Sequence, residues 1–185
     1  YYQILKLNNV KVASIGTLGV KSNNINQNLS NTTINPLQLA KILQKLKNQR
    51  INNVIMEASS HGLKQNRLDG LQFNSGIFTN LSQDHLDYHK NLNDYLNAKL
   101  YLFEKLVKKK GNVITDDKIH EFKKIKKISL RRGLRINSLF SKNYKFQILS
   151  HFFKDETQVL KIKYKNSIKK INLKLIGKIQ LKNIL

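Results

Sequence analysis

The sequence has no cysteine, no tryptophan, a single proline and a single methionine among its 185 residues. The absence of cysteine excludes a disulfide scaffold and any metal site built from thiolates. No apolar run approaches the roughly 18 residues that a membrane-spanning helix needs, and we expect no leader peptide. We therefore expect a soluble protein of the cytoplasm that has no membrane partner.

Acidic residues are also scarce: 11 Asp and Glu stand against 34 Lys and Arg, which gives a formal net charge of +23. A surplus of this size is typical of proteins that bind nucleic acids or anionic membranes. The basic residues are mostly lysines, however, and they are spread over the whole sequence together with many Asn and Ile, which indicates a general compositional bias. Because no nucleic-acid-binding motif accompanies the charge, we expect no nucleic-acid partner. A basic nucleic-acid-binding module without catalysis is kept as an alternative.

Strand-like and helix-like segments alternate over the first two-thirds of the sequence. Strands are predicted over residues 10–15, 53–58, 73–79 and 112–115, and helices over residues 1–7, 36–46 and 91–108. This order predicts an α/β fold with a mostly parallel sheet flanked by helices, in which the apolar run 53–58 is buried on both faces. Apolar and polar residues instead alternate over 158–165 and 171–175, which predicts a small antiparallel β region near the C-terminus.

Polar side chains follow the first three predicted strands, at the edge of the sheet where open α/β proteins bind ligands. Glu57 lies near the end of the apolar run, where a carboxylate is costly unless it is paired or ligates a cation. An ion pair with one of the many lysines is the alternative to a metal ligand. Asp84–His89 holds two carboxylates and two imidazoles in six residues, which without cysteine favours Mg²⁺ or Mn²⁺. Two of these four side chains could instead cap a helix.

Lys99 lies in the middle of an apolar stripe on the predicted helix 91–108. The apolar members of the stripe, at steps of three and four around Lys99, are Leu92, Leu96, Phe103 and Leu106. Burial disfavours a charged ammonium group, and a neutral amine can react with CO₂ to give a carbamate, an anion that can support a metal. The alternative is that the Lys99 stem packs while its amine reaches solvent, and periodicity alone favours this alternative.

Further polar residues lie on two loops. Asn31, Thr32 and Thr33 offer an amide and two hydroxyls before the helix 36–46. Ser59, Gln65 and Arg67 follow Glu57, and an arginine can form a two-pronged contact with a carboxylate or phosphate. Ordinary loop and cap usage would explain each of these residues singly.

Together these residues resemble the central domain of the Mur ligase family. The matching strings are Asn31-Thr32-Thr33, the run Met56–Leu63 with Gln65 and Arg67, and the run Phe78–His89 with Ala98-Lys99. The Ser-Ser-His-Gly-Leu and Asp-His-Leu-Asp-Tyr-His strings are similar to the branch of the family that extends the UDP-N-acetylmuramoyl-dipeptide. The clear match covers residues 15–111, and the tail matches weakly.

The resemblance implies a P-loop NTPase-like fold and an ATP-dependent ligase of peptidoglycan precursor synthesis. Such a ligase adds an amino acid as the third residue of the UDP-N-acetylmuramoyl-dipeptide through an acyl phosphate. Glu57 and His85 would ligate Mg²⁺, and Lys99 would be a carbamylated lysine that supports the metal, which reverses the preference that periodicity gave. The family's positions for the muramoyl-peptide substrate fall on Asn31, Thr32, Thr33, Ser59, Gln65 and Arg67.

The resemblance also implies an incomplete enzyme. Residues 1–185 match part of the central domain, without the glycine-rich phosphate loop, the N-terminal domain or the C-terminal domain of the family. We therefore expect this chain to be inactive alone and monomeric. The choice between diaminopimelate and lysine as the added amino acid is left open. A ligase of the folylpolyglutamate synthase type is a further alternative, against which the Ser-Ser-His-Gly-Leu string argues.

Overall fold

The fold is described from a computed structural model, which describes residues 1–82, 86–138, 146–154 and 157–174. The chain divides into two compact units. The first comprises Tyr1–Phe73 and Ser82–Lys108, and the second comprises Asn74–Leu81 and Lys109–Leu185. The residues that the sequence marks as site candidates and that the structure describes all belong to the first unit.

A four-stranded sheet forms the centre of the first unit, with the order β3-β2-β1-β4. Its strands are β1 (Val12–Gly16), β2 (Gly19–Lys21), β3 (Asn26–Gln27) and β4 (Asn53–Met56). β1 runs parallel to β4 and antiparallel to β2, and Gly19 closes the tight β1–β2 turn with φ of 85°, a conformation that favours glycine. The predicted strands 10–15 and 53–58 are thus confirmed. The expected burial of β4 on both faces is wrong, because its residues are half-buried or exposed at the end of the strand order.

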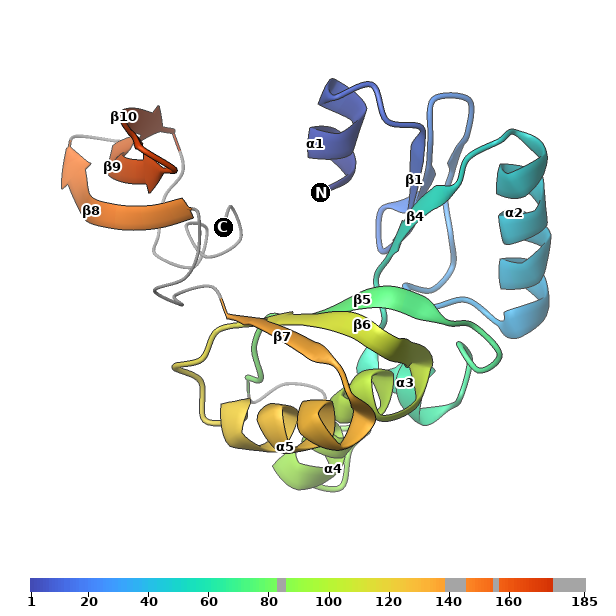
Figure 1. The fold of residues 1–185 in the computed structure, drawn as a ribbon. Coiled ribbons are helices and arrows are strands. Elements are labelled where there is room, and N and C mark those ends of the chain that lie inside the picture. The colour runs from blue at the N-terminus through green and yellow to red at the C-terminus, as the bar shows by residue number, and fades with distance from the viewer. Residues whose placement is uncertain (83–85, 139–145, 155–156, 175–185) are drawn as a thin grey trace. The chain divides into compact units, whose positions relative to one another are not determined.

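Helix α2 (Pro36–Asn48) covers this sheet, as Figure 1 shows beside β1 and β4. It begins where the sequence predicts, because Asn35 caps it by accepting a hydrogen bond from the Gln38 N–H and Pro36 suits the first turn. Leu39 and Leu46 on its inner face are buried in one cluster with Ile15 of β1. The outer face of α2 carries the exposed residues, as expected for an amphipathic helix.

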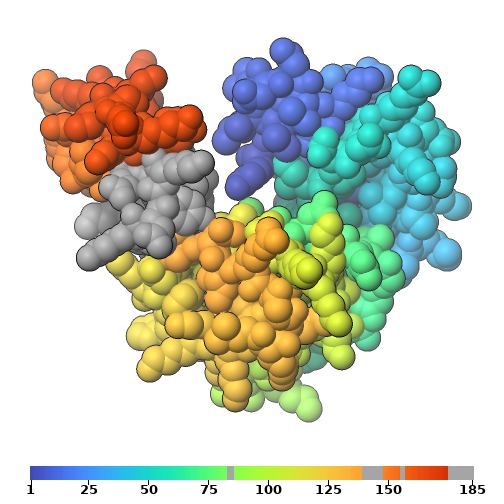
Figure 2. All heavy atoms as spheres, viewed as in Figure 1, coloured from blue at the N-terminus to red at the C-terminus, as the bar shows by residue number. Residues whose placement is uncertain are grey.

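The other helices of this unit are α1 (Tyr2–Leu7), α3 (Ser60–Lys64) and α4 (Leu92–Tyr101), which continues as the π-helical turn η1 (Leu102–Leu106). α1 lies on the surface, in the darkest blue of Figure 2, and leaves Tyr1, Ile4 and Leu7 exposed. The helix predicted over 91–108 ends at Leu106 instead, because Val107 already begins the next strand. Its apolar stripe is confirmed at Leu96, Phe103 and Leu106, which are buried, whereas Leu92 is exposed.

A second sheet has the strand order β5-β6-β7. Its strands are β5 (Phe73–Phe78), β6 (Val107–Thr115) and β7 (Arg135–Ser138). β6 and β7 are parallel and are joined by α5 (Phe122–Arg132), which ends at the left-handed Gly133. β5 and the end of β6 are predicted from the sequence, whereas α5 and β7 are not. In α5, a lysine-rich composition conceals the buried Ile125 and Ile128.

The third sheet confirms the antiparallel region predicted near the C-terminus. It consists of β8 (Phe146–Lys154), β9 (Thr157–Tyr164) and β10 (Ser167–Leu173) in the order β10-β9-β8. Leu160 and Ile162 are buried on one face, and Lys161 lies directly opposite Lys170 in the antiparallel register. No helix among the residues that the structure describes combines the length and the apolar character needed to cross a membrane.

The buried face of α2 predicts a large difference between two leucine substitutions on the same helix. Leu46→Ala should lower the free energy of unfolding by about 2–5 kcal/mol, because it removes a buried side chain and leaves a cavity. Leu37→Ala is the matched control, since Leu37 is exposed and its loss should change stability by no more than about 0.5 kcal/mol. Denaturant unfolding followed by circular dichroism measures both, and equal losses would contradict the packing described here.

Candidate functional site

Glu57 follows β4 and reaches across to the carboxyl end of β1. Its N–H donates to the Ile15 carbonyl at 2.8 Å, which extends the parallel pairing by one residue. Its carboxylate oxygen Oε2 accepts hydrogen bonds from both the N–H and the hydroxyl of Thr17, each at 2.9 Å. The Thr17 hydroxyl also lies 3.0 Å from the hydroxyl of Thr32. Three segments far apart in the sequence therefore meet at one exposed carboxylate.

Gly16 makes the close approach of Glu57 possible. A Cβ atom added at Gly16 would lie 2.6 Å from Oε2 and 2.7 Å from Cβ of Glu57. Such distances do not occur between real side chains, so any other residue at position 16 would displace the carboxylate. The end of β1 thus provides space for the carboxylate at Gly16 and two hydrogen-bond donors from Thr17.

Thr33 is the centre of a second, buried set of hydrogen bonds. Its hydroxyl donates to the Glu57 carbonyl at 3.2 Å and accepts from the N–H and the hydroxyl of Ser59, at 2.9 and 3.0 Å. Arg67 donates from Nη1 to the Thr33 carbonyl at 2.6 Å. Ser59 also caps α3 by accepting from the Gly62 N–H at 3.1 Å. Four of the residues predicted from the sequence, Glu57 among them, are therefore joined directly.

Two other predicted substrate residues make separate contacts. Gln65 donates from Nε2 to the Tyr88 hydroxyl at 2.9 Å, and Asn31 donates from Nδ2 to the Ser30 hydroxyl at 3.4 Å. Thr32 joins the first set of contacts through Thr17. Thr17 is not among the site residues predicted from the sequence, although it is one of the polar residues that follow the first predicted strand.

The predicted metal site is only partly described. His85 lies outside the described residues. Among the described residues, no group of three His, Asp or Glu side chains could hold a metal ion. The convergence of Glu57, His85 and Lys99 on one cation therefore stays a prediction. The donors that are present fit Mg²⁺, because the Glu57 carboxylate lies next to the hydroxyls of Thr17 and Thr32 and hard oxygen ligands suit this ion.

Lys99 lies half-buried on α4 with its amine over an aromatic ring. Its Nζ is 4.9 Å from the centroid of Tyr95, one turn earlier on the helix. A cation at this distance is attracted by the ring face. The two alternatives of the sequence analysis therefore stay open, since the amine is neither deeply buried nor fully extended into solvent.

His89 forms the most buried polar contact in this unit. Its Nε2 lies 3.0 Å from the Ser60 hydroxyl, and its Nδ1 lies 3.6 Å from Oδ2 of Asp94, beyond hydrogen-bond distance. Its ring stacks on Tyr95 with centroids 4.9 Å apart. In the sequence, His89 is only one member of a string that predicts metal ligands or a helix cap, and nothing in that string indicates its burial.

The surroundings of His89 favour its neutral form. Burial lowers the pKa of His89 below its ordinary value of 6.5, and the charge of Lys64 lowers the pKa further. Asp94 opposes this shift, but it is itself engaged by an ion pair with Lys64, and that ion pair together with the Lys90 N–H holds the pKa of Asp94 below its ordinary value. The buried ring is therefore uncharged near neutral pH.

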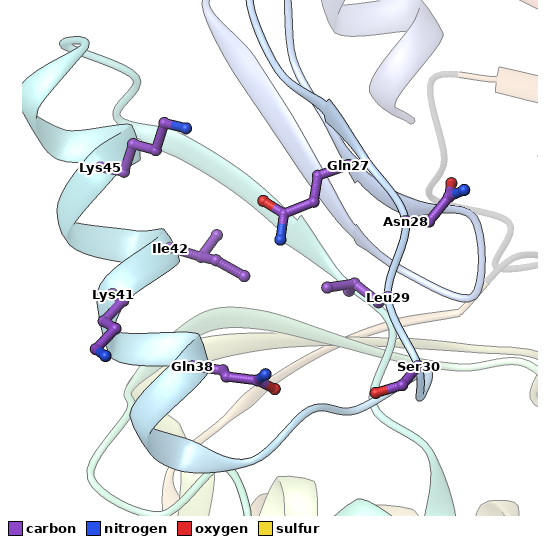
Figure 3. A pocket seen from close by; sticks show the side chains of 8 residues that line it. All are labelled: Gln27, Asn28, Leu29, Ser30, Gln38, Lys41, Ile42 and Lys45. Atoms are coloured by element: carbon purple, nitrogen blue, oxygen red, sulfur yellow. The ribbon is translucent and has the colours of Figure 1, made fainter.

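A separate pocket lies between α2 and the segment after β3, and Figure 3 shows Leu29 and Ile42 pointing toward one another across it. It is lined by Gln27, Asn28, Leu29, Ser30, Gln38, Lys41, Ile42 and Lys45. Its volume of about 280 Å³ is just below the range of roughly 300–1,000 Å³ usual for small-molecule sites. None of the predicted site residues lines it.

The parallel β1–β4 pair gathers a carboxylate and hydroxyls at its carboxyl end, where open α/β proteins bind ligands. The chain belongs to the Mur ligase family, since the Mur ligase middle domain matches residues 1–185. A similar protein is the UDP-N-acetylmuramoyl-L-alanyl-D-glutamate–2,6-diaminopimelate ligase of Wigglesworthia glossinidia brevipalpis, 39% identical over 95% of this chain. The ligase of the same name from Zymomonas mobilis is 36% identical over 99% of the chain. The chain spans 36% and 38% of the length of these two relatives.

Solved structures confirm the predicted fold class. A UDP-N-acetylmuramoyl-L-alanyl-D-glutamate–2,6-diaminopimelate ligase superposes on 99% of this chain with a TM-score of 0.81 at 24% identity, and the chain covers 37% of it. The folylpolyglutamate synthetase of Lactobacillus casei superposes on 99% of the chain with a TM-score of 0.64 at 9% identity, and the chain covers 50% of it. At these identities the two structures show a shared fold alone.

The hydrogen bonds of Thr33 predict a strong effect of removing one hydroxyl. Thr33→Val keeps the shape of the side chain but leaves the Ser59 N–H and the Glu57 carbonyl without their partner, which should cost about 1–3 kcal/mol of unfolding free energy. Thr32→Val is the control, because Thr32 is less buried and is bonded through its hydroxyl to Thr17. Denaturant unfolding of both variants provides the measurement. A Thr33→Val variant as stable as the control would refute this role.

The lowered pKa of His89 predicts a loss of stability in mild acid. The unfolded chain binds the proton more tightly than the folded protein, so the free energy of unfolding should fall as the pH drops below about 6.5. The slope contributed by one such group is at most about 1.4 kcal/mol per pH unit. Denaturant unfolding at several pH values between 7.5 and 5 gives the free energy of unfolding as a function of pH. This free energy should depend less on pH in His89→Gln than in His120→Gln, the control, since His120 is exposed. Identical slopes would show that His89 does not titrate in this range.

Proposed function

We propose that this chain is the central part of an ATP-dependent ligase that adds an amino acid to the UDP-N-acetylmuramoyl-dipeptide in peptidoglycan precursor synthesis. The proposal is carried by one connected set of hydrogen bonds at the end of the β1–β4 pair. Its members are Thr17, Thr32, Thr33, Glu57, Ser59 and Arg67. The names of the relatives from Wigglesworthia and Zymomonas support the same reaction. The reaction would take place in the cytoplasm, by a monomer.

The reaction needs two successive bond exchanges. First, a carboxylate oxygen of the dipeptide forms a bond to the γ-phosphorus of ATP, and the bond between this phosphorus and ADP breaks. The amine of the incoming amino acid then forms the amide bond, phosphate leaves, and the amine releases a proton. Both exchanges gather negative charge on the phosphoryl oxygens, and bound Mg²⁺ would supply positive charge to them.

The residues of the chain hold and orient these groups. Glu57, fixed by Thr17 and by the space at Gly16, would hold the ion together with His85. A carbamate on Lys99 would support the same ion. Arg67 is oriented by the Thr33 carbonyl, and its remaining N–H groups suit a carboxylate or phosphate of the substrate. We assign Asn31, Thr32, Thr33, Ser59 and Gln65 to the same muramoyl-peptide site.

The added amino acid in the names of the relatives is 2,6-diaminopimelate, which is therefore the amino acid to test first. Because the chain spans little more than a third of these relatives, we expect activity only in a longer protein that also carries the remaining segments. The test measures ADP release with UDP-N-acetylmuramoyl-dipeptide plus diaminopimelate, and in parallel with a folate plus glutamate. Turnover of the folate and not of the muramoyl peptide would overturn the proposal in favour of a folylpolyglutamate synthase.

The nucleic-acid alternative predicts a different result with the same protein. Binding to DNA or RNA should then fall steeply with salt through counterion release. Retention that is weak and independent of sequence even at low salt would exclude this alternative, whereas tight and selective binding without ligation would replace the ligase proposal.

The role assigned to Lys99 predicts a selective loss of turnover. In the longer protein, Lys99→Ala should lower kcat by about 10–100-fold, because the loss of a group that supports a metal has effects of this size. Added formate or acetate should restore part of the rate by supplying a carboxylate in place of the carbamate. Lys105→Ala is the matched control, since Lys105 is exposed on the adjoining turn η1. An unchanged kcat in Lys99→Ala would exclude the carbamate.

A further inference from the structure

We propose that His89 is a positioning residue that ties the substrate side of this site to Lys99. The inference rests on the proposed function and adds to it a residue that contacts neither ATP nor the metal. It is based on two contacts of one buried ring, which connect the start of α3 with the first turn of α4, and on the surroundings of the second ring nitrogen.

The first contact fixes the start of α3. The Ser60 hydroxyl lies 3.0 Å from Nε2 of His89, and both residues are buried. Ser60 directly follows Ser59, whose N–H and hydroxyl both donate to Thr33. α3 has only five residues, with Ser59 as its N-cap. A bond that holds Ser60 therefore also restricts Ser59 and the segment after the helix, which carries Arg67.

The second contact fixes the ring beneath Lys99. His89 stacks on Tyr95 with centroids 4.9 Å apart and an interplanar angle of 25°. The amine of Lys99 lies over the same Tyr95 ring, 4.9 Å from its centroid. A shift of Tyr95 would therefore move the surface against which the Lys99 amine rests.

The third observation concerns the other ring nitrogen. Nδ1 of His89 is buried, and among the described residues it has no hydrogen-bond partner, since Asp94 is 3.6 Å away. A buried polar atom without a partner is costly, and a phenylalanine would fill the same space without that cost. The hydrogen bond between Nε2, on the opposite side of the ring, and the Ser60 hydroxyl is the feature that phenylalanine could not provide. The imidazole thus combines a flat ring for Tyr95 with a polar atom for Ser60.

Two substitutions separate these contacts. His89→Phe keeps a ring on Tyr95 and loses the hydrogen bond to Ser60, whereas His89→Gln keeps a polar group for Ser60 and loses the ring. In the full-length ligase, His89→Phe should raise KM for UDP-N-acetylmuramoyl-dipeptide roughly 2–10-fold with little change in kcat, as expected for one lost hydrogen bond. His89→Gln should lower kcat about 10-fold with little change in KM, as expected for loss of an outer support of a metal site.

A spectroscopic readout follows the Lys99 side without relying on turnover. With ¹³C-labelled bicarbonate, the carbamate signal should persist in His89→Phe and weaken in His89→Gln. Ser60→Ala removes the same hydrogen bond as His89→Phe from the other partner, so it should reproduce the rise in KM even if His89→Phe does not fold. His120→Phe, at an exposed position, is the control for a general effect of exchanging a histidine for phenylalanine.

The outcomes distinguish this inference from the function on which it rests. If the unaltered ligase neither binds the muramoyl dipeptide nor turns it over, the proposed function fails. If the unaltered ligase is active but both His89 variants change KM and kcat together, or change neither while folded, His89 is only a packing residue. Opposite effects of the two variants would establish the positioning role.

Discussion

The site depends on the hydrogen bonds of the Thr33 hydroxyl. A single oxygen donates to the Glu57 carbonyl and accepts from two groups of Ser59, so the loop before α2, the end of β4 and the start of α3 are fixed to one another. Thr33 is 3% exposed, so a group that loses one of these bonds has little access to water in its place. Residues that are more than twenty positions apart in the sequence are thereby held within hydrogen-bond distance.

The position of Glu57 follows from this constraint and from the shape of its neighbour. The carboxylate is oriented by Thr17 on one side and given room by Gly16 on the other. An exposed carboxylate held by two donors from one residue is preorganised, because little side-chain freedom remains to be lost when a ligand binds. Thr17 thus holds the carboxylate of Glu57, while Thr33 holds the backbone carbonyl of the same residue.

Much of the fold could be predicted because its signals are local. Pro36 and Asn35 mark the start of α2, and the apolar run before Glu57 marks β4. The sequence offers a list of candidate site residues, because polar side chains gather at the carboxyl ends of parallel strands and because the motifs resemble the Mur ligase family. Which of these residues touch could not be predicted, because the bonds of Thr33 depend on three-dimensional proximity. His89 is the clearest example, since nothing in the string around it indicates which histidine is buried.

The errors have physical causes as well. The helical stripe through Phe103 and Leu106 continues smoothly into Val107, a β-branched residue that the structure places in a strand. α5 is hard to predict because its six basic residues outnumber its four apolar residues, of which Ile125 and Ile128 are buried. Composition that is biased toward one charged residue weakens periodicity as a signal without changing how a helix packs.

The pair of lysines in the C-terminal sheet has a consequence for the conditions under which that sheet is most stable. Lys161 and Lys170 face each other across β9 and β10, and like charges in directly opposite positions repel. Dissolved ions screen exposed charges, and the distance over which such charges interact shortens to about 8 Å at 0.15 M ionic strength. The sheet should therefore gain stability as ionic strength rises, which is the reverse of the behaviour of a sheet held by pairs of opposite charge.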